Sequence, residues 1–278
     1  MKLLETTLYT VPDKMQKAVI VDADWNEKYG FILVLKENNK FFIVINEDII
    51  YPRFKVESPL IRWVNEQQFV VINARNHSDT DNCYLVDRSG EVTTSFNCGD
   101  AIEDLVPNKE GIWVSYFDEG VFGDGISTEG LVLFSYKGKP LFRFHTDLPE
   151  RLVIDDCYAI CKGSGTGIWL CPYGDFDLIH IDKNKKVAFQ SSVPDKVKGS
   201  SAMCVRHKYA YFFSPYDKQN ALYAWEIGLG KPSKVGVING DLVRGLGPRE
   251  SNHFISSTDK TLIVIEIRNK ELDVSQYI

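Results

Sequence analysis

A short string of residues recurs along this chain and constrains its fold more than any other feature. Gly-Ile-Trp-Val-Ser-Tyr begins at Gly111, and a near copy, Gly-Ile-Trp-Leu-Cys-Pro-Tyr, begins at Gly167. Weaker copies begin at Phe69 and Tyr209, and an apolar segment and a short turn follow each copy. A unit of strands alone that recurs every ~40 to 55 residues is typical of a β-propeller blade. The chain is therefore predicted to be all-β.

Alternating apolar residues bounded by Gly, Asp, Asn and Pro divide the chain into six four-stranded blades. Their first strands begin near positions 17, 60, 101, 154, 202 and 242. Seven blades would need a further unit that the spacing does not supply, and five would require one segment to be a loop. No helix is expected. We predict one closed propeller domain that spans residues 1–278.

Both ends of the chain are assigned to the last blade. Residues 3–11 alternate like a strand, and residues 271–278 are predicted to form that blade's fourth strand. A ring of sheets must cover its terminal edges, because unpaired edges promote aggregation. We therefore expect the N-terminal strand to close the last blade beside the C-terminal strands. In the first blade, the fourth strand is predicted over residues 49–54.

Composition narrows the function class and the compartment. The chain is 44% hydrophobic with a formal net charge of -6, which disfavours a general nucleic-acid binder. The N-terminus carries Glu5 where a signal peptide needs apolar residues, and no run is long enough to span a membrane. The six cysteines contain no Cys-x-x-Cys pair and lie in apolar strand patterns, which predicts buried free thiols. A cytoplasmic location and no membrane partner are expected.

The blade pattern resembles six-bladed propellers of the group that includes YVTN-type and gluconolactonase-like proteins. The stretch from Ile102 to Gly123 resembles bacterial propeller proteins to which no function is assigned. The chain lacks the Gly-His and Trp-Asp dipeptides of WD40 repeats. This resemblance extends over nearly the whole chain, but its motifs are structural, so it implies a fold rather than an activity.

Charge is distributed unequally between the two faces of the predicted ring. Links from second to third strands, and links between blades, emerge on one face. The 13-residue link from Phe117 to Glu129 on that face carries four acidic residues and no Lys or Arg. Lysines occupy the turns of the opposite face. Aromatic residues among acids on a long loop are typical of interfaces. The predicted partner-binding residues are Tyr116, Phe117, Asp118, Glu119, Phe122, Asp124, Glu129, Tyr173, Asp175, Tyr216 and Asp217.

No catalytic motif appears, and no cofactor is predicted. The glycine-rich run from Gly163 to Gly167 precedes a strand instead of the helix that a phosphate cradle needs. One enzymatic alternative remains, which is a metal-dependent hydrolase or lactonase of the gluconolactonase-like type. The resemblance implies a calcium-type site in the central channel, for which acids near the starts of inner strands are candidates: Asp100, Glu103, Asp104, Asp155, Asp156 and Asp241.

The favoured hypothesis is a non-catalytic protein-binding propeller. An acidic, aromatic face fits a basic protein partner, with no direct binding of nucleic acid. In its most concrete form, the hypothesis is a cytoplasmic immunity protein that neutralises a bacterial toxin, such as a cationic nuclease.

Overall fold

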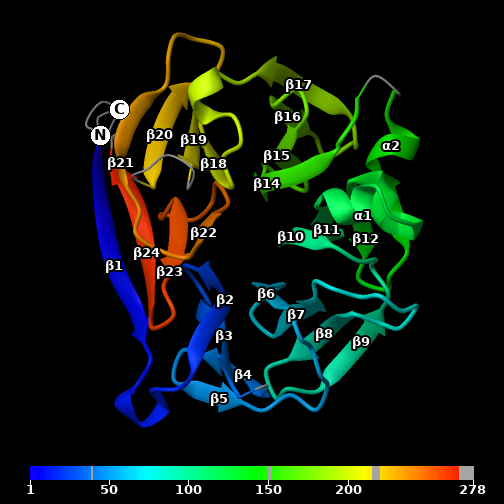
Figure 1. The fold of residues 1–278 in the computed structure, drawn as a ribbon, viewed down its shortest axis with the longest axis vertical. Helices are drawn as coiled ribbons and strands as arrows, with labels where there is room; N and C mark the ends of the chain where they lie inside the picture. Colours follow the sequence, from blue (N-terminus) through cyan, green and yellow to red (C-terminus); the bar gives the residue numbers. More distant parts are fainter. Residues whose placement is uncertain (39, 150–151, 215–219, 269–278) are drawn as a thin grey trace.

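The computed structural model describes residues 1–38, 40–149, 152–214 and 220–268. These residues form six four-stranded antiparallel sheets arranged in a ring, with the first strand of each sheet innermost (Figure 1). In each of the first five blades, the four strands follow one another in the chain from the innermost to the outermost. The structure is the all-β, six-bladed propeller that the repeat predicts.

The strand bounds agree closely with the repeat. Blade 1 comprises β2 (Val19–Asn26), β3 (Gly30–Glu37), β4 (Lys40–Ile45) and β5 (Asp48–Ile50). Blade 2 comprises β6 (Pro59–Trp63), β7 (Gln68–Asn73), β8 (Cys83–Asp87) and β9 (Val92–Phe96). Blade 3 comprises β10 (Ile102–Pro107), β11 (Gly111–Tyr116), β12 (Leu131–Ser135) and β13 (Pro140–Arg143). Blade 4 comprises β14 (Asp156–Lys162), β15 (Ile168–Tyr173), β16 (Asp177–Ile181) and β17 (Val187–Ser192). Blade 5 comprises β18 (Ala202–Arg206), β19 (Tyr209–Ser214), β20 (Ala221–Glu226) and β21 (Ser233–Val237).

The sixth blade joins the two ends of the chain. It contains β22 (Leu242–Gly245), β23 (Phe254–Ser257), β24 (Thr261–Arg268) and, outermost, β1 (Lys2–Thr10). β1 runs antiparallel to β24, with Lys2 opposite Arg268 and Thr10 opposite Thr261. The predicted closure by an N-terminal strand is confirmed, while the strand predicted over residues 271–278 lies outside the described residues.

Most strands begin or end one to three residues from their predicted bounds, and two fourth strands end earlier than predicted. The fourth strand of blade 1, expected over residues 49–54, is β5 and ends at Ile50, because Pro52 has no N–H to donate to a ladder. The fourth strand of blade 3, expected over residues 140–145, ends at Arg143 and gives way to the single helical turn α2 (Phe144–Asp147).

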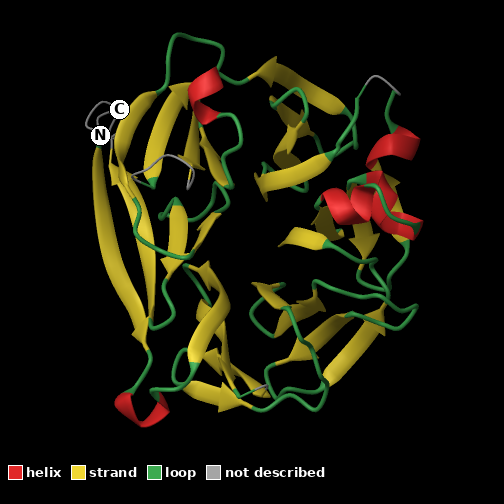
Figure 2. Cartoon of the chain, in the orientation of Figure 1, coloured by secondary structure: helices red, strands yellow, loops and turns green. Residues whose placement is uncertain are grey.

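Short helical turns lie in the links, contrary to the expectation of no helix (Figure 2). The link between β11 and β12 contains α1 (Asp118–Val121) and the 3-10 helix η2 (Gly125–Glu129). Two further 3-10 turns, η1 (Asp13–Met15) and η3 (Asp195–Val197), lie in links between blades. None of the described helices is long and apolar enough to cross a membrane.

The core lies between neighbouring blades and not within any one of them. One apolar cluster joins blades 2 and 3, including Val70 and Ile112, and another joins blades 3 and 4, including Trp113 and Ile168. All six cysteines are buried with free thiols. Because each sheet is apolar on both sides, the ring is stable only when every blade has two neighbours.

Candidate functional site

The link between β11 and β12 carries an exposed aromatic side chain on the predicted face. α1 and η2 fold the 13-residue link back over the start of blade 3, beside the neighbouring strand β14 (Figure 1). Phe122 follows α1 and is 72% exposed. Asp118 and Asp124 on either side of it are also exposed. The predicted combination of an aromatic side chain and flanking acids is therefore present on the surface.

Buried hydrogen bonds fix this link to blade 3. The Ser127 hydroxyl donates to the carbonyl of Asp100 at 2.8 Å and accepts from the Asp100 N–H at 2.9 Å. The Phe117 N–H donates to the carbonyl of Ala101 at 2.9 Å. A Cβ added to Gly120 would lie 2.9 Å from that same Asp100 carbonyl oxygen, so only glycine permits this close approach.

His145 ties the same link to blade 4. Its Nδ1 lies 2.7 Å from the Thr128 carbonyl oxygen, and its Nε2 accepts the N–H of Ile154 at 2.9 Å. This pairing requires the tautomer with the proton on Nδ1, because the carbonyl oxygen can only accept. The link is therefore held both at the start of its own blade 3 and, through His145, at blade 4.

Some of the predicted acids are already paired within the chain. Arg75 of blade 2 lies 2.6 Å from the Glu119 carboxylate and stacks over the Phe117 ring, with its guanidinium carbon 5.4 Å from the centroid. Glu129 accepts the Thr146 N–H and hydroxyl at 2.9 and 2.5 Å. Asp118 and Asp124 are thus the carboxylates of this link that point to solvent without an ion pair in the described structure.

Tyr116 is not a surface residue, contrary to the prediction. Its side chain is fully buried, and its hydroxyl donates to the Cys98 carbonyl at 2.6 Å. The ring packs in the cluster between blades 2 and 3. The alternation of apolar residues along a strand is the same whether an aromatic residue at its end points to solvent or into the interface between blades. Tyr116 points into the interface.

Blade 4 adds a second aromatic group to this face. Tyr173 is 46% exposed and contacts Tyr158 and Phe176 with ring centroids 5.8 and 5.2 Å apart. Asp175 in the same turn is exposed. Phe176 adopts a φ of 53°, which is rare for a bulky residue and recurs at functional loops. Tyr158 and Phe176 were not predicted, while Tyr216 and Asp217 lie outside the described residues.

Two carboxyl groups lie on first strands behind this surface: Glu103 on β10, which is partly buried, and Asp156 at the start of β14, which is buried. Burial and the charges of Asp104 and Asp156 raise the pKa of Glu103 to about 7. Burial and the charge of Asp118 raise the pKa of Asp156 to about 6, although backbone N–H groups of Asp118 and Cys157 oppose the shift. Both shifts favour the neutral, protonated form of the carboxyl group, because burial and neighbouring negative charge disfavour ionisation.

The first strands carry a charge network that the sequence analysis missed. Arg62 of β6 donates to Asp22 of β2 and to Asp104 of β10, so one guanidinium joins three blades. Arg244 of β22 donates in the same way to Asp24 of β2. Although burial opposes it, the pKa of Arg62 is raised by the carboxylates of Asp104, Asp22 and Asp24. Charged residues at the centre of otherwise apolar strands, as in Ile61-Arg62-Trp63, were the available signal.

The six acids named for a metal site do not form one. Asp104 is bound to Arg62, and Asp100 lies 3.4 Å from Arg75 and 3.3 Å from His77. Within the described ranges, no group of three or more His, Cys, Asp or Glu side chains is arranged to hold a metal ion. Asp241 is exposed, Asp155 is half-buried, and neither approaches a common centre with the others. The metal-dependent alternative is therefore not favoured.

Comparison with solved structures supports the fold. A catalytically inactive virginiamycin B lyase from Staphylococcus aureus, solved with quinupristin, has a TM-score of 0.59 and 10% identity, with 96% of this chain and 99% of that chain covered. YCF48 bound to D1 peptide has a TM-score of 0.56 and 10% identity, with 97% and 98% covered. The Cps50 (Swd1) β-propeller domain of Myceliophteria thermophila has a TM-score of 0.53 and 11% identity, with 96% and 100% covered.

These neighbours agree with the resemblance to propellers of the YVTN and gluconolactonase-like type, and at this identity they show the fold alone. No protein-family model matches the chain, and no curated protein sequence matches it.

Proposed function

We propose that this chain is a non-catalytic, protein-binding propeller that engages a basic partner through an acidic rim. The rim consists of the exposed side chains Asp118, Phe122, Asp124, Tyr173 and Asp175. The observation that carries the proposal is Phe122, which is 72% exposed between two exposed acids although its loop is held in place by buried bonds. Folding alone does not require a large apolar side chain at this position.

The rim combines the two features that protein recognition uses. Exposed aromatic rings supply apolar anchors, which contribute most of the binding energy at interfaces. Carboxylates around them accelerate the encounter with a positively charged protein. The bonds of Ser127 and His145 hold the loop in one conformation, so little entropy is lost when a partner binds.

Structural neighbours support a protein partner. One of them, YCF48, was solved with a peptide bound, and another is the propeller domain of Swd1. In this chain Asp22 and Asp104 are paired with Arg62, and among the described residues no three acids are arranged to hold a metal ion, which favours binding over the metal-dependent alternative. A partner of positive charge is the simplest complement to the rim.

In its most concrete form, the proposal is an immunity protein that neutralises a cationic nuclease in the cytoplasm. A nuclease presents a basic surface because it must bind phosphates, and an acidic rim could cover that surface. Six buried free thiols are in keeping with a reducing compartment.

The test begins with the products of the reading frames adjacent to this gene, each purified and measured for binding to the full chain. Asp118→Asn, Asp124→Asn and Asp175→Asn combined should slow association and reduce its salt dependence, because screened charges act mainly on the on-rate. Phe122→Ala should instead accelerate dissociation, at a cost of about 1 to 3 kcal/mol in binding free energy.

The matched control is Lys137→Ala with Lys139→Ala, two exposed lysines in the turn between β12 and β13 on the opposite face. These changes should leave both rates unaltered. Binding that is lost with the lysine pair and retained with the rim variants would place the interface on the other face. Co-expression that fails to protect cells from a binding toxin would overturn the immunity role alone.

A further inference from the structure

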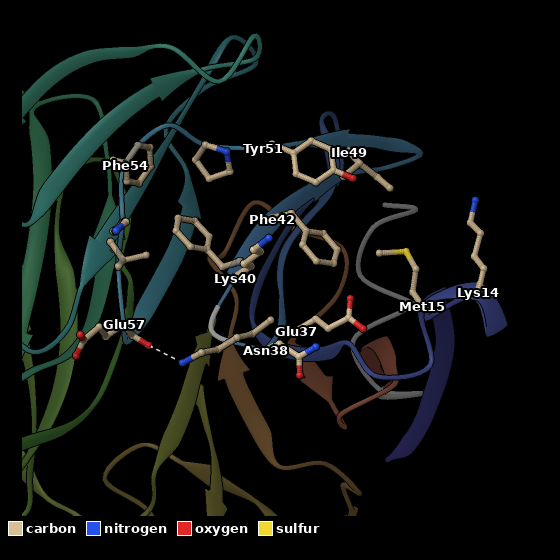
Figure 3. A pocket seen from close by; sticks show the side chains of 15 residues that line it. Lys14, Met15, Glu37, Asn38, Lys40, Phe42, Ile49, Tyr51, Phe54 and Glu57 are labelled. Atoms are coloured by element: carbon tan, nitrogen blue, oxygen red, sulfur yellow. Dashed lines mark hydrogen bonds between the residues drawn. The ribbon is translucent and has the colours of Figure 1, made fainter.

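A groove at the outer edge of blade 1 forms a second surface, separate from the acidic rim. It has a volume of about 1140 Å³ and lies among η1, the end of β3, the start of β4 and the link from β5 to β6. In Figure 3, Phe42 and Lys40 lie at its centre, between Tyr51 and Ile49 on one side and Glu37 on the other. By topology it opens on the same face as the rim, two blades away.

The groove exists because the fourth strand of blade 1 stops early. β5 pairs with β4 only from Ile43 opposite Ile50 to Ile45 opposite Asp48. Extending that register by two residues would set Phe41 opposite Pro52, which cannot donate a hydrogen bond. In the described part of the chain, no strand pairs with the outer edge of β4 from Lys40 to Phe42.

The unpaired edge presents hydrogen-bonding groups to the groove. The Asn46 N–H donates to the Phe31 carbonyl at 3.2 Å. The backbone N–H and carbonyl groups of even-numbered residues in β4 therefore point toward β3, and those of odd-numbered residues point toward the outer edge. The backbone N–H and carbonyl of Phe41 therefore face the groove. An extended peptide could accept and donate there and so continue the sheet.

Apolar side chains on both sides of this edge would contact such a peptide. Tyr51 is 74% exposed and Ile49 39% exposed. The Tyr51 ring lies 6.0 Å from that of Phe42, and Phe54 lies 5.9 Å from Phe41, so the walls are aromatic. Exposed aromatic and aliphatic side chains beside a free edge strand form a surface of the kind that binds peptides.

The charge of the groove selects the kind of peptide. Four lysines line it, against two glutamates: Lys14, Lys36, Lys40 and Lys55, with Glu37 and Glu57. None of these six makes an ion pair with a described residue; Lys36 donates instead to the Glu57 backbone carbonyl at 3.0 Å. The local charge is therefore positive, in a chain with a net charge of -6. Two copies of this edge would repel one another through their lysines, which disfavours self-association.

We propose that this groove binds an extended, acidic segment of a partner protein, which adds a strand to the free edge of β4. The rim and the groove are distinct, so this inference does not depend on the function proposed for the rim. A single partner with a basic surface and an acidic tail could occupy both.

The test uses an alternating glutamate–valine octapeptide, labelled at one end, titrated into the full chain at low salt. Binding should be saturable and weaken as salt is added, because the lysines are exposed. Lys40→Glu with Lys55→Glu should raise the Kd by about tenfold or more. The same peptide with every backbone nitrogen methylated should bind the unchanged chain as poorly as the unmethylated peptide binds the lysine variant, because neither edge of the peptide can then donate to the Phe41 carbonyl.

Two controls separate specific docking from simple charge attraction. Lys137→Glu with Lys139→Glu on the opposite face should leave the Kd unchanged, and a lysine–valine octapeptide should not bind. Absence of binding by the glutamate–valine peptide would overturn the proposal. An affinity that withstands N-methylation, or that both lysine pairs affect equally, would overturn strand addition at this edge. Neither result bears on the rim, whose variants are measured separately.

Discussion

At the scale of single residues, the first strands of the ring carry two kinds of carboxyl group, those with an arginine partner and those without one. Asp22 and Asp104 both accept hydrogen bonds from Arg62, and this pairing offsets the cost of burying three charges. Glu103, next to Asp104 on β10, has no such partner in the described structure. Burial is the main cause that raises the pKa of Glu103 to about 7, and the negative charges of Asp104 and Asp156 add to it.

Glu103 therefore makes stability depend on pH in a definite direction. A carboxyl group whose pKa is raised on folding contributes no penalty below its ordinary pKa, and destabilises the fold as pH rises toward 7. Glu103→Gln removes the ionisable group and keeps the shape. We expect this variant to be more stable than the wild type by about 1 to 3 kcal/mol at about pH 8, and equally stable near pH 4.5.

Urea denaturation at the two pH values measures this difference. Glu47→Gln is the matched control, because Glu47 is exposed in the turn between β4 and β5, and it should change stability by less than about 0.5 kcal/mol at either pH. A gain in stability from Glu103→Gln that is the same at both pH values would show that ionisation of Glu103 does not destabilise the folded protein.

At the scale of elements, strands were predictable and short irregular turns were not. β11 occupies Gly111–Tyr116, the bounds that the repeat indicates, because a buried strand has a regular apolar pattern. α1 is a single turn whose position depends on contacts of Gly120 and Ser127 with the backbone of Asp100, about two dozen residues earlier in the chain. No local pattern records such contacts.

The candidate site divides in the same way. The exposed residues Phe122, Asp118 and Asp124 were predictable, because a long link rich in acids and aromatics rarely folds inward. Tyr116 was misplaced, since its burial depends on packing against the neighbouring blade. The bonds from Arg62 to Asp22 and Asp104 join positions 40 and 42 residues apart, and only the closed ring brings them together.

The rigidity of the α1–η2 link can be tested at Ser127. Ser127→Ala removes the hydroxyl that bonds both backbone groups of Asp100, in a position that is 1% exposed. We expect a loss of about 1 to 3 kcal/mol in the free energy of unfolding, because both groups lose a partner. Hydrogen exchange should accelerate across α1 and η2 and remain unchanged in blades 1 and 6.

The neighbouring Thr128 provides a control for this prediction. Its hydroxyl donates to the Gly125 carbonyl within the same link, in an exposed setting. Thr128→Ala should therefore alter stability by less than about 0.5 kcal/mol. Equal effects from the two variants would argue against Ser127 as the main attachment of the link.

At the scale of the whole molecule, β1 is the element that closes the ring. Leu3 packs against Gly236 of blade 5, and a Cβ added to that glycine would lie 2.4 Å from the Leu3 Cδ1 atom. Tyr9 contacts Phe31 of blade 1, with ring centroids 5.4 Å apart. β1 thus contacts the blades on both sides of its own. Lys260, just before β24, also donates to the carbonyls of Gln16 and Ala18 in the link that leads to blade 1.

Deleting residues 1–10 should consequently destabilise the entire ring and not blade 6 alone. The deletion removes the partner of β24 along its whole length and exposes a long apolar edge. We expect the free energy of unfolding to fall by several kcal/mol, which is a large share of the total for a domain of this kind. The measurement is the melting temperature, which should be lower, with a single cooperative transition. Adding a synthetic peptide of residues 1–12 should restore the melting temperature in a concentration-dependent manner, because the peptide can occupy the vacated edge. A scrambled peptide should have no effect. If the truncated chain melts at the same temperature as the full chain, β1 does not close the ring energetically, whatever its place in the sheet.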